Sequence, residues 1–306
     1  MSHAFDPHAD FQPNPALGRH VVGCTCRLHG RRLFTGALLA SGVAAALPAR
    51  AQVQMDSRSQ LGGLVPAEEV EAAAAQEYSK MLAQARQQNA LAPANHPQVV
   101  RLRAIADRLI PFSTSPNLKA TSRASRWKWE INLIGSQQVN AFCMPGGKIA
   151  VFYGLLDKLQ ASDEEVAMVM GHEIAHALRE HARERMGKSA ATTGLIELGA
   201  ALFGLGSGGR YLANLGGQLL TMRFGRDDEL EADKVGLELA ARAGYDPAAG
   251  ITLWQKMGQS SGGAPPEWLS THPAGETRIR DIRNTLPAVE GLYARAPKPP
   301  RRFGPP

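Results

Sequence analysis

The pattern that best indicates the fold and site of this protein lies in the stretch Ser162-Asp-Glu-Glu-Val-Ala-Met-Val-Met-Gly-His-Glu-Ile-Ala-His176. Its Ser-Asp-Glu-Glu start has the capping-box spacing that predicts the beginning of a helix. Residues four positions apart share a helix face, so the imidazoles of His172 and His176 can converge on one ion. Neutral imidazoles suit zinc, and Glu173 lies beside them as a candidate general base. The stretch therefore predicts two metal ligands and a base.

A catalytic zinc site needs a third protein ligand, which has to come from a downstream element. Residues 229–233 read Glu-Leu-Glu-Ala-Asp and open a second, acidic helix. Glu229 and Asp233 share one face of that helix, whereas Glu231 points elsewhere. Spacing alone does not decide which of the two glutamates is the ligand.

The helix of the motif is expected to continue without a break from residue 163 to residue 186. On such a helix His181 follows His172 by nine residues, which places it about 180° around the axis. His181 is therefore expected at the protein surface rather than among the ligands.

Hydrophobic periodicity predicts an α+β fold dominated by helices. Helices are expected at 66–88, 97–110, 226–243, 247–257 and 274–285, and β-like runs at 127–134, 139–143 and 148–152. Pro145-Gly-Gly147 predicts a hairpin between the last two runs, so we expect a small antiparallel sheet of about three strands. The apolar stretch 190–220 contains Glu197, Arg210 and eight glycines, which favours a buried or substrate-facing helical hairpin over a membrane-spanning one.

The first 51 residues resemble a twin-arginine export signal, with Arg31-Arg32, a weakly apolar stretch and Ala49-Arg-Ala51 as a cleavage pattern. An ordinary basic N-terminus or an uncut anchor is less favoured, because the apolar run is shorter than the ~20 residues that a bilayer requires. Cleavage after Ala51 would leave residues 52–64 as a linker, 65–290 as the catalytic domain and 291–306 as a disordered tail. The mature chain, without a stable transmembrane segment, is expected in the periplasm or associated with a membrane there.

The net charge of +6 does not indicate nucleic-acid binding. Five Arg and two Asp in the leader contribute +3 of it, which leaves +3 for the rest of the chain. Cleavage would also remove Cys24 and Cys26 and leave Cys143 alone, so no intramolecular disulfide is expected.

Four segments together resemble the metallopeptidases of the HtpX, BepA and CAAX prenyl protease family, and the Oma-type mitochondrial proteases look similar. These segments are Asn140-Ala-Phe-Cys-Met-Pro-Gly-Gly147, Gly171-His-Glu-Ile-Ala-His176, Glu229-Leu-Glu-Ala-Asp233 and Ser270-Thr-His-Pro273. The resemblance covers about residues 65–286 and implies a mainly helical, gluzincin-type metallopeptidase domain with one zinc ion per chain. It implies His172, His176 and Glu229 as zinc ligands, Asp233 behind them and Glu173 as general base.

His272 has two alternative functional roles, of which the resemblance implies the first. It either occupies the open zinc position as a latch or donates a hydrogen bond to the substrate carbonyl; a third reading is a simple cap of the next helix. Arg223, Arg226 and Arg278 are alternative donors to that carbonyl. The strand Lys148-Ile149-Ala150-Val151 is expected to border the cleft and to receive the substrate as an added strand.

These expectations describe a zinc-dependent endopeptidase of the bacterial cell envelope that acts on misfolded or extended proteins. Outer-membrane assembly proteins are its candidate partners. Two other readings stay open from the sequence: a chaperone or assembly factor with a latched zinc, and an intramembrane protease if residues 190–220 cross a bilayer.

Overall fold

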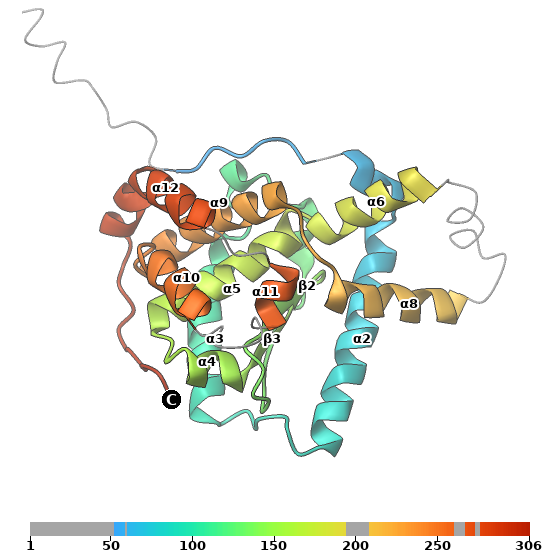
Figure 1. Cartoon of the computed structure of the whole chain (residues 1–306), viewed down its shortest axis with the longest axis horizontal. Coiled ribbons are helices and arrows are strands. Elements are labelled where there is room, and N and C mark those ends of the chain that lie inside the picture. Colours follow the sequence, from blue (N-terminus) through green and yellow to red (C-terminus); the bar gives the residue numbers. More distant parts are fainter. Residues whose placement is uncertain (1–51, 59, 194–207, 260–266, 273–275) are drawn as a thin grey trace, which may run out of the picture. The chain divides into compact units, whose positions relative to one another are not determined.

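The computed structural model describes residues 52–58, 60–193, 208–259, 267–272 and 276–306 (Figure 1). The expected leader, residues 1–51, lies outside the described residues, and so does the middle of the expected 190–220 hairpin. No helix in the described part of the chain combines the length and the hydropathy needed to span a bilayer.

Helices dominate the described chain, and the predicted α+β class is confirmed. The α-helices are α2 (Ala67–Gln87), α3 (Pro97–Leu109), α4 (Tyr153–Lys158), α5 (Asp163–Leu178), α6 (His181–Thr193), α8 (Gly208–Thr221), α9 (Arg226–Arg242), α10 (Ala249–Gln259), α11 (Glu267–Thr271) and α12 (Glu276–Arg295). The strands are β1 (Glu130–Ile134), β2 (Ala141–Met144) and β3 (Lys148–Phe152). Short 3-10 helices are η1 (Gln60–Leu64), η2 (Ile110–Phe112), η3 (Pro116–Leu118) and η4 (Ser122–Arg126).

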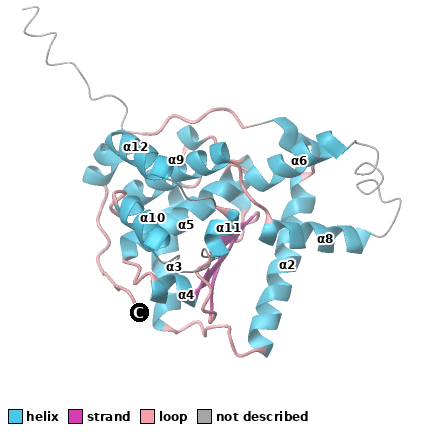
Figure 2. Ribbon diagram, in the orientation of Figure 1, coloured by secondary structure: helices cyan, strands magenta, loops and turns pink. Residues whose placement is uncertain are grey.

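Helix α5, which carries the motif, lies at the centre of the domain. It begins at the predicted capping box: Glu165 N donates to Ser162 Oγ at 3.2 Å, and Ser162 N donates to the Glu165 carboxylate at 2.8 Å. Helix α9 packs along α5, strand β2 contacts α5 from the sheet, and α3 and α10 cover further sides (Figure 2). Because every side chain from Glu165 to Leu178 is buried, packing on all sides holds the helix in place.

Helices α5 and α9 approach each other closely at two glycines. A Cβ added at Gly236 would lie 2.9 Å from the backbone nitrogen of His172, and one at Gly171 would lie 3.1 Å from the carbonyl oxygen of Gly236. Only glycine at these two positions permits this separation of the helices. The contact therefore brings His172 and the start of α9 together.

The sheet is mixed, which corrects the expected antiparallel sheet. Its strand order is β1-β3-β2, in which β2 and β3 form the predicted antiparallel hairpin but β1 pairs parallel to β3. The hairpin turn uses Gly146 and Gly147 with φ of 86° and 77°, a region that favours glycine. Periodicity identified the three strands, but it carries no information on which arm of the hairpin accepts the third strand.

The expected helix over 163–186 is also wrong, because the chain divides it into α5 and α6. Glu180 adopts a left-handed conformation with φ of 58° between the two helices. This turn changes the direction of the chain just before His181, so positions computed for one continuous helix do not apply to α6.

Both ends of the described chain are packed more tightly than expected. In the expected linker, Val53 and Met55 are buried, and Val53 N donates to Glu238 of α9 at 2.8 Å. The expected disordered tail over 291–306 is wrong at its start, since α12 continues to Arg295. Further on, Phe303 N donates to Asp163 at 2.7 Å, which ties the tail to the start of α5.

Candidate metal centre

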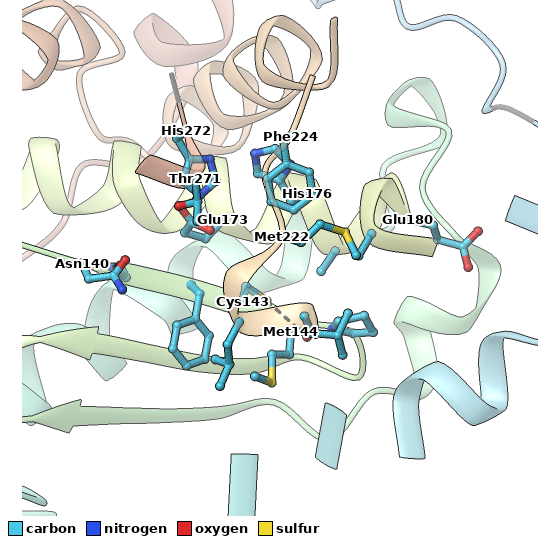
Figure 3. A pocket seen from close by; sticks show the side chains of 17 residues that line it. Asn140, Cys143, Met144, Glu173, His176, Glu180, Met222, Phe224, Thr271 and His272 are labelled. Atoms are coloured by element: carbon cyan, nitrogen blue, oxygen red, sulfur yellow. Dashed lines mark hydrogen bonds and ion pairs between the residues drawn. The ribbon is translucent and has the colours of Figure 1, made fainter. Parts of the chain in front are cut away.

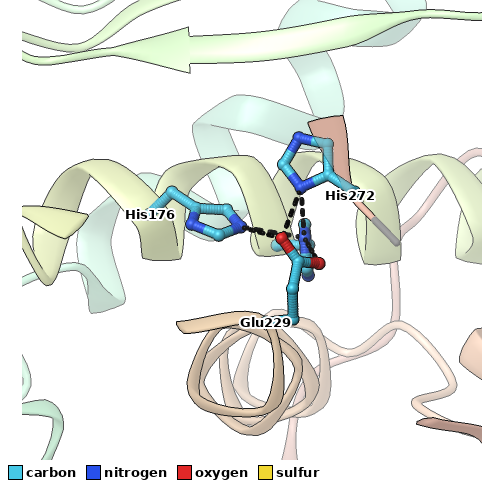
Figure 4. Close-up of side chains that lie close together, drawn as sticks. His176, Glu229 and His272 are labelled. Atoms are coloured by element: carbon cyan, nitrogen blue, oxygen red, sulfur yellow. Dashed lines mark hydrogen bonds and ion pairs between the residues drawn. The ribbon is translucent and has the colours of Figure 1, made fainter. Parts of the chain in front are cut away.

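Four buried side chains from three elements converge beside α5. His172 and His176 come from successive turns of α5, Glu229 from the first turn of α9, and His272 from the residue after α11. Figure 4 shows His176, Glu229 and His272 pointing at one another between the helices. One atom from each of the four residues lies within 4.8 Å of the others, so the fold joins the sequence-predicted ligands with His272.

The spacing of these atoms fits a tetrahedral metal ion. Two ligand atoms with bonds of ~2.0–2.1 Å in a tetrahedron lie about 3.3 Å apart. The Nε2 atoms of His172 and His176 are 3.0 Å apart, and Nδ1 of His272 lies 3.3 Å from His172 Nε2 and 2.9 Å from Glu229 Oε1. Glu229 is 3.5 Å and 3.6 Å from the Nε2 atoms of the two α5 histidines.

The buried charges around the cluster also fit a divalent cation. Glu173, Glu229 and Asp233 are buried carboxylates, whereas Arg278 is the buried guanidinium that contacts two of them. These carboxylates outnumber the guanidinium, and their uncompensated charge would be costly in a buried site without a cation. A doubly charged ion at the four converging atoms would neutralise them.

The same environment shifts the pKa values of the groups in the cluster. Burial acts to lower the pKa of His172, but the carboxylates of Asp233 and Glu229 outweigh it and raise that pKa to about 9. Burial and the neighbouring His172 lower the pKa of His176 well below its ordinary value. Burial acts to raise the pKa of Glu229, yet hydrogen bonds from His172 and His272 lower it. The glutamate is therefore a charged ligand.

Asp233 and Arg278 support the ligands from behind. Asp233 Oδ1 lies 3.0 Å from His172 Nδ1, so this carboxylate accepts the hydrogen on the ring atom that faces away from the cluster. Arg278 of α12 donates to Asp233 at 2.6 and 2.7 Å and also donates to Glu229. Its place behind the ligands speaks against the substrate-carbonyl role considered from the sequence. Arg223, another of those candidates, donates to the carbonyl of Ser270.

Glu173 lies on the open side of the cluster. Its Oε1 accepts a hydrogen bond from Trp268 Nε1 at 2.6 Å and lies 3.6 Å from His272 Nε2. The segment α11–His272 therefore contacts both the candidate base and the candidate ligands. A periodicity argument could not place Trp268, because no pattern in the sequence connects it to the motif.

A cleft opens in front of Glu173, His176 and His272 (Figure 3). Strand β2 forms one wall, and the end of α8 with the segment after it forms another. Most of the lining is apolar, and it includes Phe142, Met144, Leu219, Leu220, Met222 and Phe224. Burial raises the pKa of the Cys143 thiol well above its ordinary value, so this residue adds a neutral group to the wall.

The strand predicted to receive the substrate is the wrong arm of the hairpin. Lys148, Ile149, Ala150 and Val151 belong to β3, the central strand, whose backbone is paired with β1 on one side and β2 on the other. All four residues are buried and none lines the cleft. The cleft is bordered by β2 instead, because β1 occupies the other edge of β3.

His181 was expected at the surface and is buried, with 1% of its area exposed. The turn at Glu180 directs it back towards α5, where its Nδ1 lies 2.9 Å from His176 Nδ1. Its Nε2 lies 2.7 Å from Glu231, the glutamate of α9 that does not reach the metal cluster. The expectation failed because it assumed one continuous helix.

Two histidines and a glutamate on adjacent helices, with a second glutamate facing a cleft, define the class of metallopeptidases that carry the HExxH motif. The comparison with protein families agrees: this chain belongs to peptidase family M48, whose model matches residues 98–286. The match confirms the family indicated by the four segments.

Curated relatives fall in two groups. Over 201 residues the chain is 35% identical to the mitochondrial metalloendopeptidase OMA1 of Schizosaccharomyces pombe, covering 65% of this chain and 56% of that protein. The Arabidopsis thaliana protein of the same name is 40% identical over 173 residues, covering 56% of this chain and 35% of its own length. The beta-barrel assembly-enhancing protease of Escherichia coli K12 is 32% identical over 188 residues, covering 58% of this chain and 38% of that protein. The matched region thus spans between about a third and just over half of the length of these relatives.

Proposed function

We propose that this protein is a zinc-dependent endopeptidase. The observation that carries the proposal is the convergence of His172, His176 and Glu229 beside Glu173, which lines a mostly apolar cleft. Imidazole and carboxylate ligands in a tetrahedral arrangement suit zinc better than calcium or magnesium, which take six or more oxygen ligands.

Zinc, when bound, would polarise the substrate carbonyl and make a nearby water molecule more acidic. Glu173 would take the proton from that water as the water attacks the peptide carbonyl, and would then deliver it to the leaving amine nitrogen. In the latched arrangement Trp268 Nε1 holds the Glu173 carboxylate by a hydrogen bond at 2.6 Å, and this bond is released when the α11 segment moves. Asp233 holds His172 by a hydrogen bond from the other side.

His272 is best explained as a latch on this site. Its Nδ1 belongs to the cluster of four ligand atoms and lies 2.9 Å from Glu229 Oε1. A donor to the substrate carbonyl would instead have to leave the fourth position of the ion open for the substrate or the water. In this arrangement His272 fills the position that a substrate needs, so the site opens when the α11 segment moves.

The substrates are expected to be extended chains with apolar side chains. Within the described residues no strand pairs with the outer edge of β2, and this strand lines the cleft. An extended peptide could add to that edge by main-chain hydrogen bonds, which would align it in front of Glu173. The apolar walls around Phe142, Met144 and Leu219 would accept an apolar side chain.

We also propose that the protease works in the bacterial periplasm on misfolded envelope proteins. The twin-arginine-like leader supports export, and the name of the beta-barrel assembly-enhancing relatives supports outer-membrane assembly proteins as partners. These relatives are longer than the matched region.

Metal analysis of the purified protein together with degradation of casein tests the proposal. We expect about one zinc per chain, loss of cleavage with a chelator and recovery on addition of zinc. Glu173→Gln should keep the zinc and reduce cleavage by about 10²–10⁴-fold, because only the proton transfer is lost.

The exposed Glu290 of α12 provides a matched control. Glu290→Gln makes the same chemical change outside the cleft and should leave both zinc content and cleavage unchanged. If Glu173→Gln binds zinc and cleaves casein as fast as the wild type, the peptidase proposal fails.

A further inference from the structure

We propose that His181 and Glu231 are positioning residues of the metal centre. Together they hold His176 in the one tautomer that can bind a metal through Nε2. The inference rests on the metal centre of the proposed function, and it concerns two residues that the sequence did not place in the site.

The geometry forms a continuous chain of contacts behind His176. Its Nε2 faces the cluster, 3.0 Å from His172 Nε2, and its Nδ1 faces the opposite way, 2.9 Å from His181 Nδ1. The Nε2 atom of His181 lies 2.7 Å from Glu231 Oε2. The two imidazoles are buried, so water does not readily replace these partners.

When a metal is bound, only one direction of hydrogen bonding gives every nitrogen of His176 and His181 a suitable partner. Nε2 of His176 has to offer a lone pair to the ion, so the ring hydrogen is on Nδ1 and is donated to His181. Nδ1 of His181 therefore accepts, which places the hydrogen of His181 on Nε2, directed at Glu231. In this arrangement each ring nitrogen of the two histidines has a matching partner.

Arg179 holds Glu231, the last residue in this series of contacts. Its Nη2 donates to Glu231 Oε1 at 2.7 Å, and its two terminal nitrogens also donate to the backbone carbonyls of Asp56, Leu118 and Lys119. Each oxygen of the Glu231 carboxylate thus has its own partner, Arg179 on Oε1 and His181 on Oε2. Its carboxylate is thereby held in one orientation.

The contacts of His176 with His181 and Glu231 resemble the support of the other histidine ligand, His172. Asp233 of α9 accepts directly from His172 Nδ1 at 3.0 Å, whereas His176 lies one turn further along α5. There the carboxylate of Glu231, also from α9, reaches the ligand through the imidazole of His181. Phe224 stacks on His176 at 4.0 Å between ring centres, which restrains the ring plane but not the position of its hydrogen.

Glu231→Gln is the decisive variant, because it preserves shape and changes only the direction of hydrogen bonding. Arg179 donates on one side, so the glutamine has to turn its oxygen to Arg179 and its NH₂ group to His181. His181 would then carry its hydrogen on Nδ1 and donate to His176, whose own hydrogen would move to Nε2 and block the metal. We expect zinc affinity, measured by competition with a chelating dye, to fall about 10–100-fold.

Two further variants and a control separate positioning from simple packing. His181→Phe removes the acceptor and should lower zinc affinity to a similar degree, whereas His181→Asn keeps an oxygen near the position of Nδ1 and should restore most of it. Glu238 is the matched control: it is a buried glutamate of the same helix, bonded to Val53 N, Asn117 and Arg242. Glu238→Gln should lower the Tm of the zinc-free protein and leave zinc affinity unchanged.

The outcomes distinguish this inference from the proposed function. Reduced zinc affinity in Glu231→Gln, with the Tm of the zinc-free protein near the wild-type value, supports the positioning role. Wild-type zinc affinity in both Glu231→Gln and His181→Phe overturns it and leaves the zinc centre intact; if His181→Phe does not fold, Glu231→Gln decides alone. A wild-type protein that binds no zinc overturns the proposed function itself.

Discussion

His272 closes the metal cluster from the side of the cleft, and its neighbour Trp268 reinforces that closure. The indole of Trp268 stacks on the His272 ring with 5.0 Å between centres and donates to Glu173. One short segment therefore places His272 at a candidate ligand position and holds the candidate base, Glu173, through Trp268. Opening the site requires this segment to release both contacts.

His272→Ala should raise casein cleavage by roughly tenfold, because removal of the latch contact increases the population of the open site. The measurement is the initial rate at equal zinc content. Ser270→Ala serves as control, since among the described residues Ser270 Oγ bonds to Glu267 of the same short helix and to no group of the cluster. Complete loss of cleavage in His272→Ala would refute the latch and assign His272 a role in catalysis.

At the scale of elements, the spacing of α5 and α9 sets the geometry of the ligands. These two helices supply His172, His176 and Glu229, and they touch through Gly171 and Gly236. A side chain at the contact would separate the helices, and the rigid packing around α5 leaves little room for adjustment.

Gly236→Ala should destabilise the protein by about 1–3 kcal/mol, because its methyl group would lie 2.9 Å from the backbone of His172. Zinc affinity should fall as well, since His172 and Glu229 move apart. Gly217→Ala in α8 is the control: a Cβ there meets no atom of the described residues within 4 Å, so the change should stabilise by up to ~1 kcal/mol. Urea unfolding measures the stability of both variants. An unchanged midpoint for Gly236→Ala would contradict the close packing of α5 and α9.

The link between α2 and η4 makes a pH-dependent contribution. Glu71 of α2 accepts from Arg123 at 2.7 and 2.8 Å and from Trp127 at 2.9 Å. Burial acts to raise the pKa of Glu71, but these partners outweigh it and lower the pKa below 4.5. A carboxylate with a lowered pKa stabilises the folded state above the unfolded-state value and loses that contribution as the pH falls through its folded-state value.

Glu71→Gln should therefore cost at most about 1 kcal/mol at neutral pH, because both partners are partly exposed. The difference from the wild type should narrow as the pH is lowered below 4.5. Urea unfolding at a series of pH values measures it. A difference that stays constant down to full protonation of the glutamate would show that the charge plays no part.

At the scale of the whole molecule, the metal centre joins parts of the chain that lie far apart in sequence. Residues on α5, α9 and the α11 segment meet at four atoms, and α12 adds Arg278 behind them. An ion bound at that point stabilises only the folded state, because the unfolded chain does not hold these ligands together.

Removal of zinc should lower the Tm by roughly 10 °C, as expected for about 4 kcal/mol of linkage at a thousandfold excess over Kd in a domain of this size. Differential scanning calorimetry with and without a chelator measures the shift. Glu229→Gln, which weakens the ligand set, should show a smaller shift than the wild type. A wild-type Tm that is insensitive to chelation would contradict a zinc ion shared by these elements.

Local sequence patterns determined the elements and the residues of the motif. The capping box, the i, i+4 spacing of His172 and His176, and the alternation of the strands depend on neighbours within about one turn, so they are legible in the sequence. The resemblance to known metallopeptidases supplied Glu229 as third ligand, which spacing could not choose over Glu231.

Tertiary structure decided which of these residues meet. The pairing of β1 with β3 made β2 the edge strand at the cleft, and the left-handed Glu180 turned His181 from the expected surface to the back of His176. Strand partners and a single reversal in backbone direction arise from contacts between distant residues, and no periodicity records them. The sequence therefore determined the chemistry of the site, whereas its borders and its support depend on the fold.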